Sequence, residues 1–168
     1  MCLKRFSKCK CCEVESVFGH SLKEGVIFVG ITSLVISLVM LFTAITGLLV
    51  ISCMKKQYNN NPIVATNLIF GLVAACLSTY QIIITLLLLW QATKGNIFLC
   101  SLWFVSHISL LTMYFLLFSA EVVVCFVKKR FITAVVTMFI GILYEATFIY
   151  FAIIVNSYLH SLNQTRYL

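Results

Sequence analysis

The hydrophobic pattern of the chain consists of four long apolar stretches separated by short polar segments. The stretches cover residues 25–52, 62–91, 97–127 and 131–156, and each exceeds the about 20 apolar residues that a helix needs to cross a bilayer. Spans with such short connections fold as sequential antiparallel neighbours. The pattern predicts an all-α integral membrane protein: a four-helix transmembrane bundle, up-down-up-down, with short loops. Residues 1–24 form a basic, cysteine-rich N-terminal tail and residues 157–168 a short C-terminal tail.

The composition agrees with an integral membrane protein and argues against a soluble domain and against a nucleic-acid-binding protein. Of the 168 residues, 62% are hydrophobic and 10% are charged, which leaves too few charges for the polar shell of a soluble domain. The net charge is +7, but the bases gather at the ends of the apolar stretches rather than along one face. Bases in this position are typical of membrane flanks that meet anionic headgroups, and they argue against a nucleic-acid partner.

The N-terminal tail mixes cysteines with basic residues. Its cysteines are Cys2, Cys9, Cys11 and Cys12. Cysteines beside bases near a membrane span favour reversible acylation, as in palmitoylation. A zinc site is a weaker alternative, because this spacing lacks the two-residue gap that lets paired thiolates reach one tetrahedral metal. Free thiols without a role are the third alternative. We expect neither a metal nor a cofactor.

Among the polar side chains within the predicted spans, six are candidate site residues: Asn67, Gln81, His107, Tyr114, Glu121 and Glu145. An acidic side chain at the centre of a span costs about 2.5–3.5 kcal/mol on insertion scales, so it should face protein or water. Antiparallel folding groups the six into three layers: Asn67 with Glu121, Tyr114 with Glu145, and Gln81 with His107. Internal hydrogen bonding that holds the bundle together explains such layers, and so does a proton or ion path. We expect Glu145 to be buried and to accept a hydrogen bond from Tyr114.

Small residues indicate where the helices can approach one another. Asn67, Gly71 and Ala75 recur every four residues and therefore share one face of a helix. Gly30 occupies a similar position in the first span. These positions predict close helix packing, although small residues are also simply frequent in membrane spans.

The distribution of bases predicts the orientation by a narrow margin. Seven bases lie on the side of the two termini: Lys4, Arg5, Lys8, Lys10, Lys23, Lys94 and Arg166. The other five, Lys55, Lys56, Lys128, Lys129 and Arg130, lie on the opposite side. The positive-inside rule then favours cytoplasmic termini. Taken one by one, however, the second, third and fourth spans each have more bases at the end near Lys55 or Lys128 than at the end on the side of the termini. With cytoplasmic termini, the N-glycosylation sequence that begins at Asn163 faces the cytosol, and we expect Asn163 to carry no glycan.

The start of the chain resembles a group of small four-span proteins. The pair Cys11-Cys12 is followed by Leu22-Lys23-Glu24-Gly25 and then by an aliphatic run through Gly30. This order is similar to that of the insect Pasiflora-type septate-junction proteins and, more distantly, of the lysosome-associated four-span proteins. The resemblance covers about the first 30 residues and the four-span plan, and it implies a junctional or endosomal setting. Lys23 stands where the group has Arg, and no proline-tyrosine motif follows the fourth span.

Three classes of function remain open from the sequence. The first is a non-enzymatic junctional or trafficking organiser that works through lateral helix contacts with other membrane proteins or with itself. The alternative is a small transporter, or a subunit of one, that uses Glu121, His107 and Glu145. An intramembrane enzyme is disfavoured because Asp and the common catalytic motifs are absent. The expected location is the plasma membrane or an endosomal or lysosomal membrane, in contact with its lipids.

Overall fold

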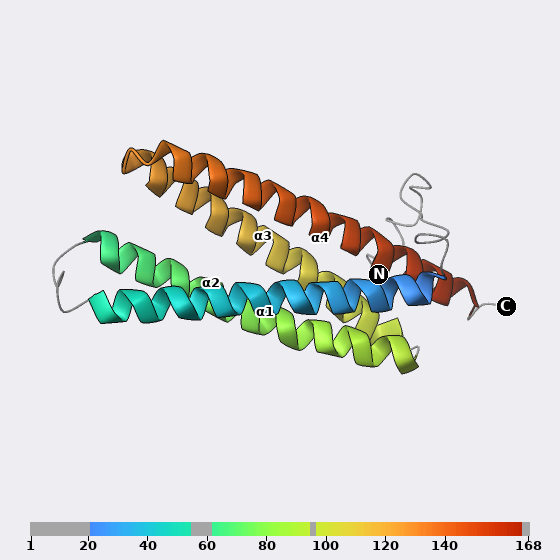
Figure 1. Ribbon diagram of the computed structural model, residues 1–168. Helices are drawn as coiled ribbons and strands as arrows, with labels where there is room; N and C mark the ends of the chain where they lie inside the picture. The colour runs from blue at the N-terminus through green and yellow to red at the C-terminus, as the bar shows by residue number, and fades with distance from the viewer. Residues whose placement is uncertain (1–20, 55–61, 95–96, 166–168) are drawn as a thin grey trace.

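The computed structural model describes residues 21–54, 62–94 and 97–165. They form four helices: α1 (Leu22–Met54), α2 (Pro62–Lys94), α3 (Ile97–Val127) and α4 (Phe131–Thr165). No strand occurs in these ranges. Successive helices run in opposite directions, so α1 begins and α4 ends at the same end of the bundle (Figure 1). Each helix is long and apolar enough to cross a membrane, which confirms the all-α, four-span, up-down-up-down bundle.

A capping box starts α1 at Leu22, ahead of the apolar stretch that begins at Gly25. The backbone N–H of Ser21 donates to Glu24 Oε2 (3.1 Å), and the backbone N–H of Glu24 donates to Ser21 Oγ (3.4 Å). This reciprocal pair satisfies two of the backbone donors that a helix N-terminus leaves free. The helix therefore includes polar residues that hydropathy alone assigns to the tail.

The turn between α3 and α4 is a Schellman motif closed by three basic residues. The N–H of Lys129 donates to the carbonyl of Phe126 (2.9 Å), and that of Arg130 donates to the carbonyl of Cys125 (2.9 Å). Lys129 takes the left-handed conformation that such a turn requires, with φ of 56°. We call the end of the bundle that holds this turn the turn end, and the opposite one the termini end.

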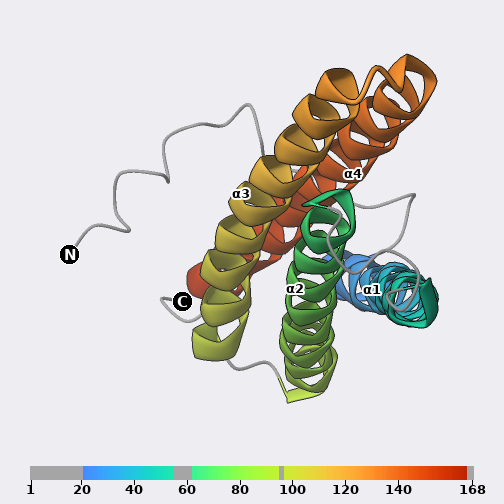
Figure 2. The same cartoon turned by 90° about the vertical axis from the view of Figure 1, so that its left-hand side faces the viewer.

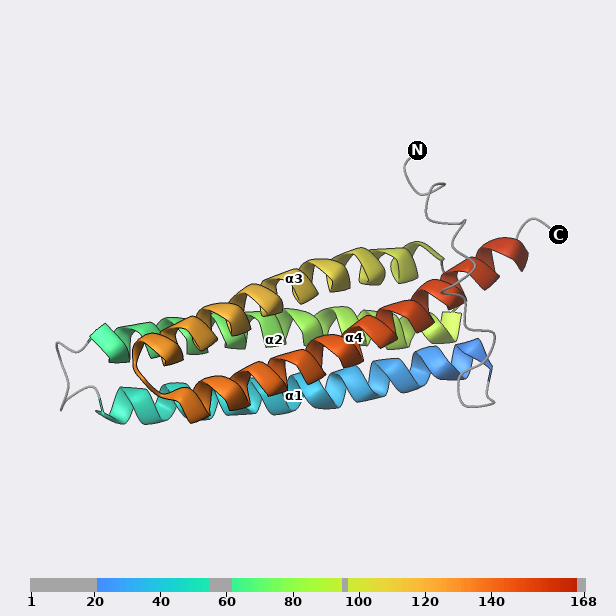
Figure 3. The same ribbon diagram turned by 90° about the horizontal axis from the view of Figure 1, so that it is seen from above.

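The helices pack as two close pairs, α1 with α2 and α3 with α4 (Figures 1 and 2). Seen from above, the pair of α3 and α4 lies in front of the pair of α1 and α2 (Figure 3). A Cβ added at Gly30 would lie 2.5 Å from Leu89 Cδ2, and one added at Gly71 would lie 2.9 Å from Leu48 Cδ2. Both glycines, which the sequence marks as packing positions, thus lie in the contact between α1 and α2, each against a leucine of the other helix. Ala75, one turn after Gly71 on α2, is half-buried.

The buried core lies mostly in the half of the bundle toward the termini end. Its largest fully buried side chains include Trp103, Tyr114, Phe148, Leu88 and Ile154. In contrast, residues 38–53 and 64–77 contain no buried side chain, and in residues 115–127 and 131–140 only Cys125 and Ala134 are buried. The helix pairs separate toward the turn end, as Figure 1 shows. One half of the molecule is therefore closely packed and the other is open.

Candidate functional site

A hydrogen-bonded polar layer joins three helices near the middle of the bundle. Tyr144 of α4 donates its hydroxyl to Gln81 Oε1 of α2 at 2.8 Å. The amide of Gln81 in turn donates to Ser33 Oγ of α1 (3.5 Å), and Ser33 Oγ lies 3.3 Å from Thr85 Oγ1. Gln81, Ser33 and Thr85 are each almost fully buried. Their polar atoms satisfy one another, so this layer holds helices together without solvent.

Tyr114, from α3, belongs to the same layer but has a different partner from the expected one. Its hydroxyl lies 3.2 Å from Ser78 Oγ of α2, and its ring lies 4.9 Å from that of Tyr144. The expected hydrogen bond from Tyr114 to Glu145 is not formed. Glu145 is half-buried, and its Oε1 has no hydrogen-bond partner among the described residues. Tyr144, the neighbour of Glu145 in sequence, takes the position facing α2 and α3.

His107 lies in an aromatic cluster rather than beside Gln81. Its ring stacks on Trp103 with centroids 4.3 Å apart and lies 5.2 Å from the ring of Phe148. Neither ring nitrogen reaches a partner at hydrogen-bond geometry within the described part of the chain. The proposed layer of Gln81 and His107 is therefore replaced by two separate environments, one hydrogen-bonded and one aromatic.

Two further buried polar groups at the termini end lack partners. Both amide atoms of Gln91 and the indole nitrogen of Trp103 make no hydrogen bond to residues in the described ranges. Gln91 is 1% exposed and Trp103 is 2% exposed. A buried polar group without a partner costs about 1–3 kcal/mol. Close packing at this end therefore coexists with unsatisfied polar groups.

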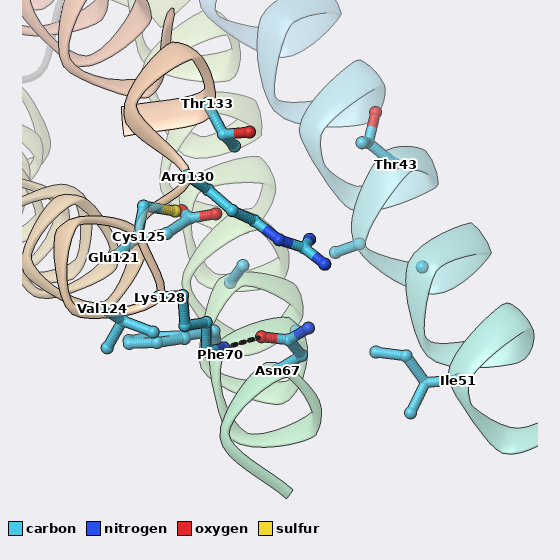
Figure 4. Close-up of a pocket in the computed structure, with 14 residues that line it drawn as sticks. Thr43, Ile51, Asn67, Phe70, Glu121, Val124, Cys125, Lys128, Arg130 and Thr133 are labelled. Atoms are coloured by element: carbon cyan, nitrogen blue, oxygen red, sulfur yellow. Dashed lines mark hydrogen bonds between the residues drawn. The ribbon is translucent and has the colours of Figure 1, made fainter. Parts of the chain in front are cut away.

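A pocket of about 340 Å³ opens at the turn end between the two helix pairs. All four helices line it, and its polar lining residues are Thr43, Asn67, Glu121, Lys128, Arg130 and Thr133. Lys128 Nζ donates to Asn67 Oδ1 at 3.4 Å, and the guanidinium of Arg130 extends into the space in front of α1 (Figure 4). The half-buried Glu121 lies on the pocket wall near Cys125. The structure thus brings Asn67 and Glu121, the third expected pair, to one pocket.

Sequence reasoning missed most of the partners in these sites. Ser78, Gln81 and Thr85 are spaced by three and four residues on α2, which places them on one helix face. That polar stripe is visible in the sequence and could have identified the layer that α2 shares with α1, α3 and α4. The two cations of the pocket, Lys128 and Arg130, were considered only as markers of orientation.

The cysteines and possible metal ligands add no further site in the described chain. Cys53 and Cys76 are exposed free thiols, and Cys100 and Cys125 are buried free thiols. No group of three or more His, Cys, Asp or Glu side chains in residues 21–54, 62–94 and 97–165 is arranged to hold a metal ion. The four acylation candidates, Cys2, Cys9, Cys11 and Cys12, lie outside the described residues.

Comparison with known proteins gives no relative from which a function can be carried over. No family model matches the chain, no curated protein matches it, and no solved structure matches it.

Proposed function

We propose that this protein is a non-enzymatic membrane organiser that binds the transmembrane helices of other membrane proteins, or of further copies of itself, through lateral contacts. A junction of the plasma membrane or an endosomal or lysosomal membrane is the proposed setting. The connections between the helices are short, since α1 and α2 are joined by residues 55–61 and α2 and α3 by residues 95–96. Recognition by the helical part of the chain then has to take place largely within the bilayer.

The outward face of α1 is the observation that carries this proposal. Large apolar side chains recur along it at steps of four and three residues: Ile31, Val35, Leu38, Phe42, Ile45 and Leu49. All six are exposed, and Phe42 is the most exposed at 73%. This heptad spacing keeps the side chains on one seam when helices cross at about +20°, the common geometry of membrane bundles. We call these six residues the α1 seam.

The half of α1 that carries most of the α1 seam makes little use of its surface within the protein itself. No residue of α1 between positions 38 and 53 is buried, and α1 packs closely only against α2. This half of α1 adds no buried side chain to the core of the protein, so it is free to contact a neighbouring protein. In lipid, such contacts depend on packing rather than on exclusion of water.

Site-specific photo-crosslinking in native membranes tests this proposal. A photoreactive side chain replaces either Phe42 in the α1 seam or Phe139 of α4, which is 62% exposed and serves as the matched control. We expect discrete protein adducts from position 42 and mainly lipid adducts from position 139. Equal yields of protein adducts at the two positions would mean that the α1 seam only faces lipid. Imaging of a tagged copy distinguishes junctional from endosomal placement.

The transporter alternative stays a prediction and gains no support from the geometry. Its three residues lie in different surroundings: Glu121 on the pocket wall, His107 in the aromatic cluster and Glu145 at a half-buried position. No hydrogen bond joins any two of them in the part of the chain that the structure describes. Proton-dependent flux into reconstituted vesicles, abolished by Glu121→Gln, would favour this alternative over the organiser.

A further inference from the structure

The pocket at the turn end has the composition of a binding site for an amphiphile. Its walls include apolar side chains from three helices, namely Ile51, Phe70 and Val124. Its polar side carries two cations, Lys128 and Arg130, against one carboxylate, Glu121. We propose that this pocket binds the phosphate group of an anionic phospholipid, with an acyl chain lying against the apolar wall. This site is independent of the α1 seam.

The depth of the pocket in the membrane supports a lipid rather than a soluble ligand. On α2, Trp90 is half exposed and Lys94 Nζ lies 4.8 Å from the centre of its ring, as is typical of a membrane interface. Asn67, which binds Lys128, lies 23 residues before Trp90, or about 35 Å along the helix. The hydrocarbon layer is about 30 Å thick. Lys128 therefore lies at the level of the opposite headgroups.

The cations are positioned by the backbone of the turn rather than by each other. The Schellman motif fixes Lys128, Lys129 and Arg130 in successive orientations, and only Lys128 and Arg130 line the pocket. Lys128 is bound at 3.4 Å by Asn67, a long contact to a neutral amide that a phosphate oxygen can supplement. The guanidinium of Arg130 points across the pocket in Figure 4, with N–H donors suited to phosphate oxygens.

The one carboxylate in the pocket belongs to a residue attached deeper in the membrane than Lys128. Glu121 precedes Lys128 by seven residues, which is about 10 Å along α3. The backbone of Glu121 therefore lies deeper in the membrane than that of Lys128, and the pocket carries two cations against this one carboxylate. Small side chains on the facing helices, Ala44, Gly47 and Ala74, leave the intervening space open.

Lipid retention by the full chain tests the proposal. The protein is purified from nanodiscs of mixed phosphatidylglycerol and phosphatidylcholine, and the retained lipid is measured by native mass spectrometry. Nanodiscs carry the same mixture in both leaflets, so the result does not depend on orientation. We expect preferential retention of phosphatidylglycerol by the wild type, reduced about fivefold for each cation removed in Lys128→Gln and Arg130→Gln. Lys129→Gln, in the same turn but outside the pocket, is the matched control and should retain the wild-type preference.

A second variant separates the pocket from the charge of the turn. No heavy atom lies within 4 Å of a Cβ added at Gly47, so Gly47→Leu fills the pocket without clashing at its first atom and without altering charge. We expect it to lower phosphatidylglycerol retention to a similar degree, with helix content unchanged by circular dichroism. Equal losses in Lys129→Gln and Lys128→Gln, or full retention in Gly47→Leu, would show general attraction to the turn and overturn the site. Displacement of the lipid by millimolar inorganic phosphate would show a free-anion site and would also overturn it.

Discussion

Toward the termini end, the rings of Trp103, His107 and Phe148 fill the space between the helices, whereas toward the turn end Gly47 and Ala74 border an open pocket. The two halves contain helices of the same kind and similar hydrophobicity. What differs is the size of the side chains that face inward. This size decides the packing, because lipid supplies no hydrophobic force that would close a gap between helices. The helices are therefore closely packed where stacked rings face inward, and the pocket lies where small residues do, with Phe70 as an aromatic residue on its wall.

Removal of the central ring of the packed half should have the largest effect. Phe148 is fully buried and contacts the rings of His107, Tyr144 and Phe151. Phe148→Ala should lower the free energy of unfolding by about 3–5 kcal/mol, since a buried aromatic truncation leaves a cavity. Denaturation by sodium dodecyl sulfate measures the change. Phe139→Ala, at a lipid-facing position, is the control; a loss as large as that of Phe148→Ala would contradict the contrast between core and lipid faces.

The same substitution at two buried glutamines should have opposite signs. Gln91 has no hydrogen-bond partner in the described chain, whereas Gln81 has two. Gln91→Leu should raise the stability by about 1–3 kcal/mol, because it removes an unsatisfied buried amide. Gln81→Leu should lower it, because Tyr144 then loses its acceptor and Ser33 loses one of its two side-chain hydrogen bonds. Thermal midpoints in detergent compare the two, and a loss of stability on both substitutions would mean that Gln91 is satisfied in the membrane.

A smaller effect is expected from the hydroxyl that links α4 to α2. Tyr144→Phe removes the 2.8 Å hydrogen bond to Gln81 and keeps the ring contacts with Tyr114 and Phe148. Interhelical hydrogen bonds in membranes contribute about 0.6 kcal/mol on average and up to about 1.7. A double-mutant cycle with Gln81→Leu measures the coupling; additive losses would show that the bond does not hold the two helices together.

The smallest effect should come from the open end. Lys129 has a φ of 56°, a conformation that costs non-glycine residues free energy and costs glycine little. Lys129→Gly should therefore stabilise the protein by about 0.5–1 kcal/mol, and Lys129→Val should destabilise it. The same denaturation assay compares them. If Val were tolerated as well as Gly, the turn would not require the left-handed conformation.

The number of helices and the membrane-spanning part of each could be predicted from the sequence, because both depend on the thickness of the membrane. Each apolar stretch has to cross the same thickness, so hydropathy locates it. Hydropathy gives no signal for helix ends that lie in polar sequence, such as the capping box of Ser21 and Glu24. The fourth helix likewise continues to Thr165, past the apolar stretch that ends at Asn156.

The partners of the polar groups could not be predicted, because depth does not determine which face of a helix points inward. Tyr114 and Glu145 were assigned to one level, and Tyr144, one residue away from Glu145, does contact Tyr114 there. One residue along a helix rotates the side chain by about 100°, which is enough to replace the carboxyl by the phenol. For His107, the aromatic neighbours determined its environment instead of the polar residue at its level.

The extension of α4 places part of the core outside the lipid. Tyr144 bonds to Gln81, and the two helices run in the same direction, so Ser157 lies near the level of Lys94 and the residues after it reach water. There, Leu159 and Leu162 pack with Leu22 against the buried cluster. Water drives these side chains together, as in any soluble protein, while the rest of the bundle is held by packing and by interhelical hydrogen bonds. Urea weakens hydrophobic association in water more than packing between helices in lipid. Increasing urea should therefore unfold the termini end of this protein before the rest of the bundle.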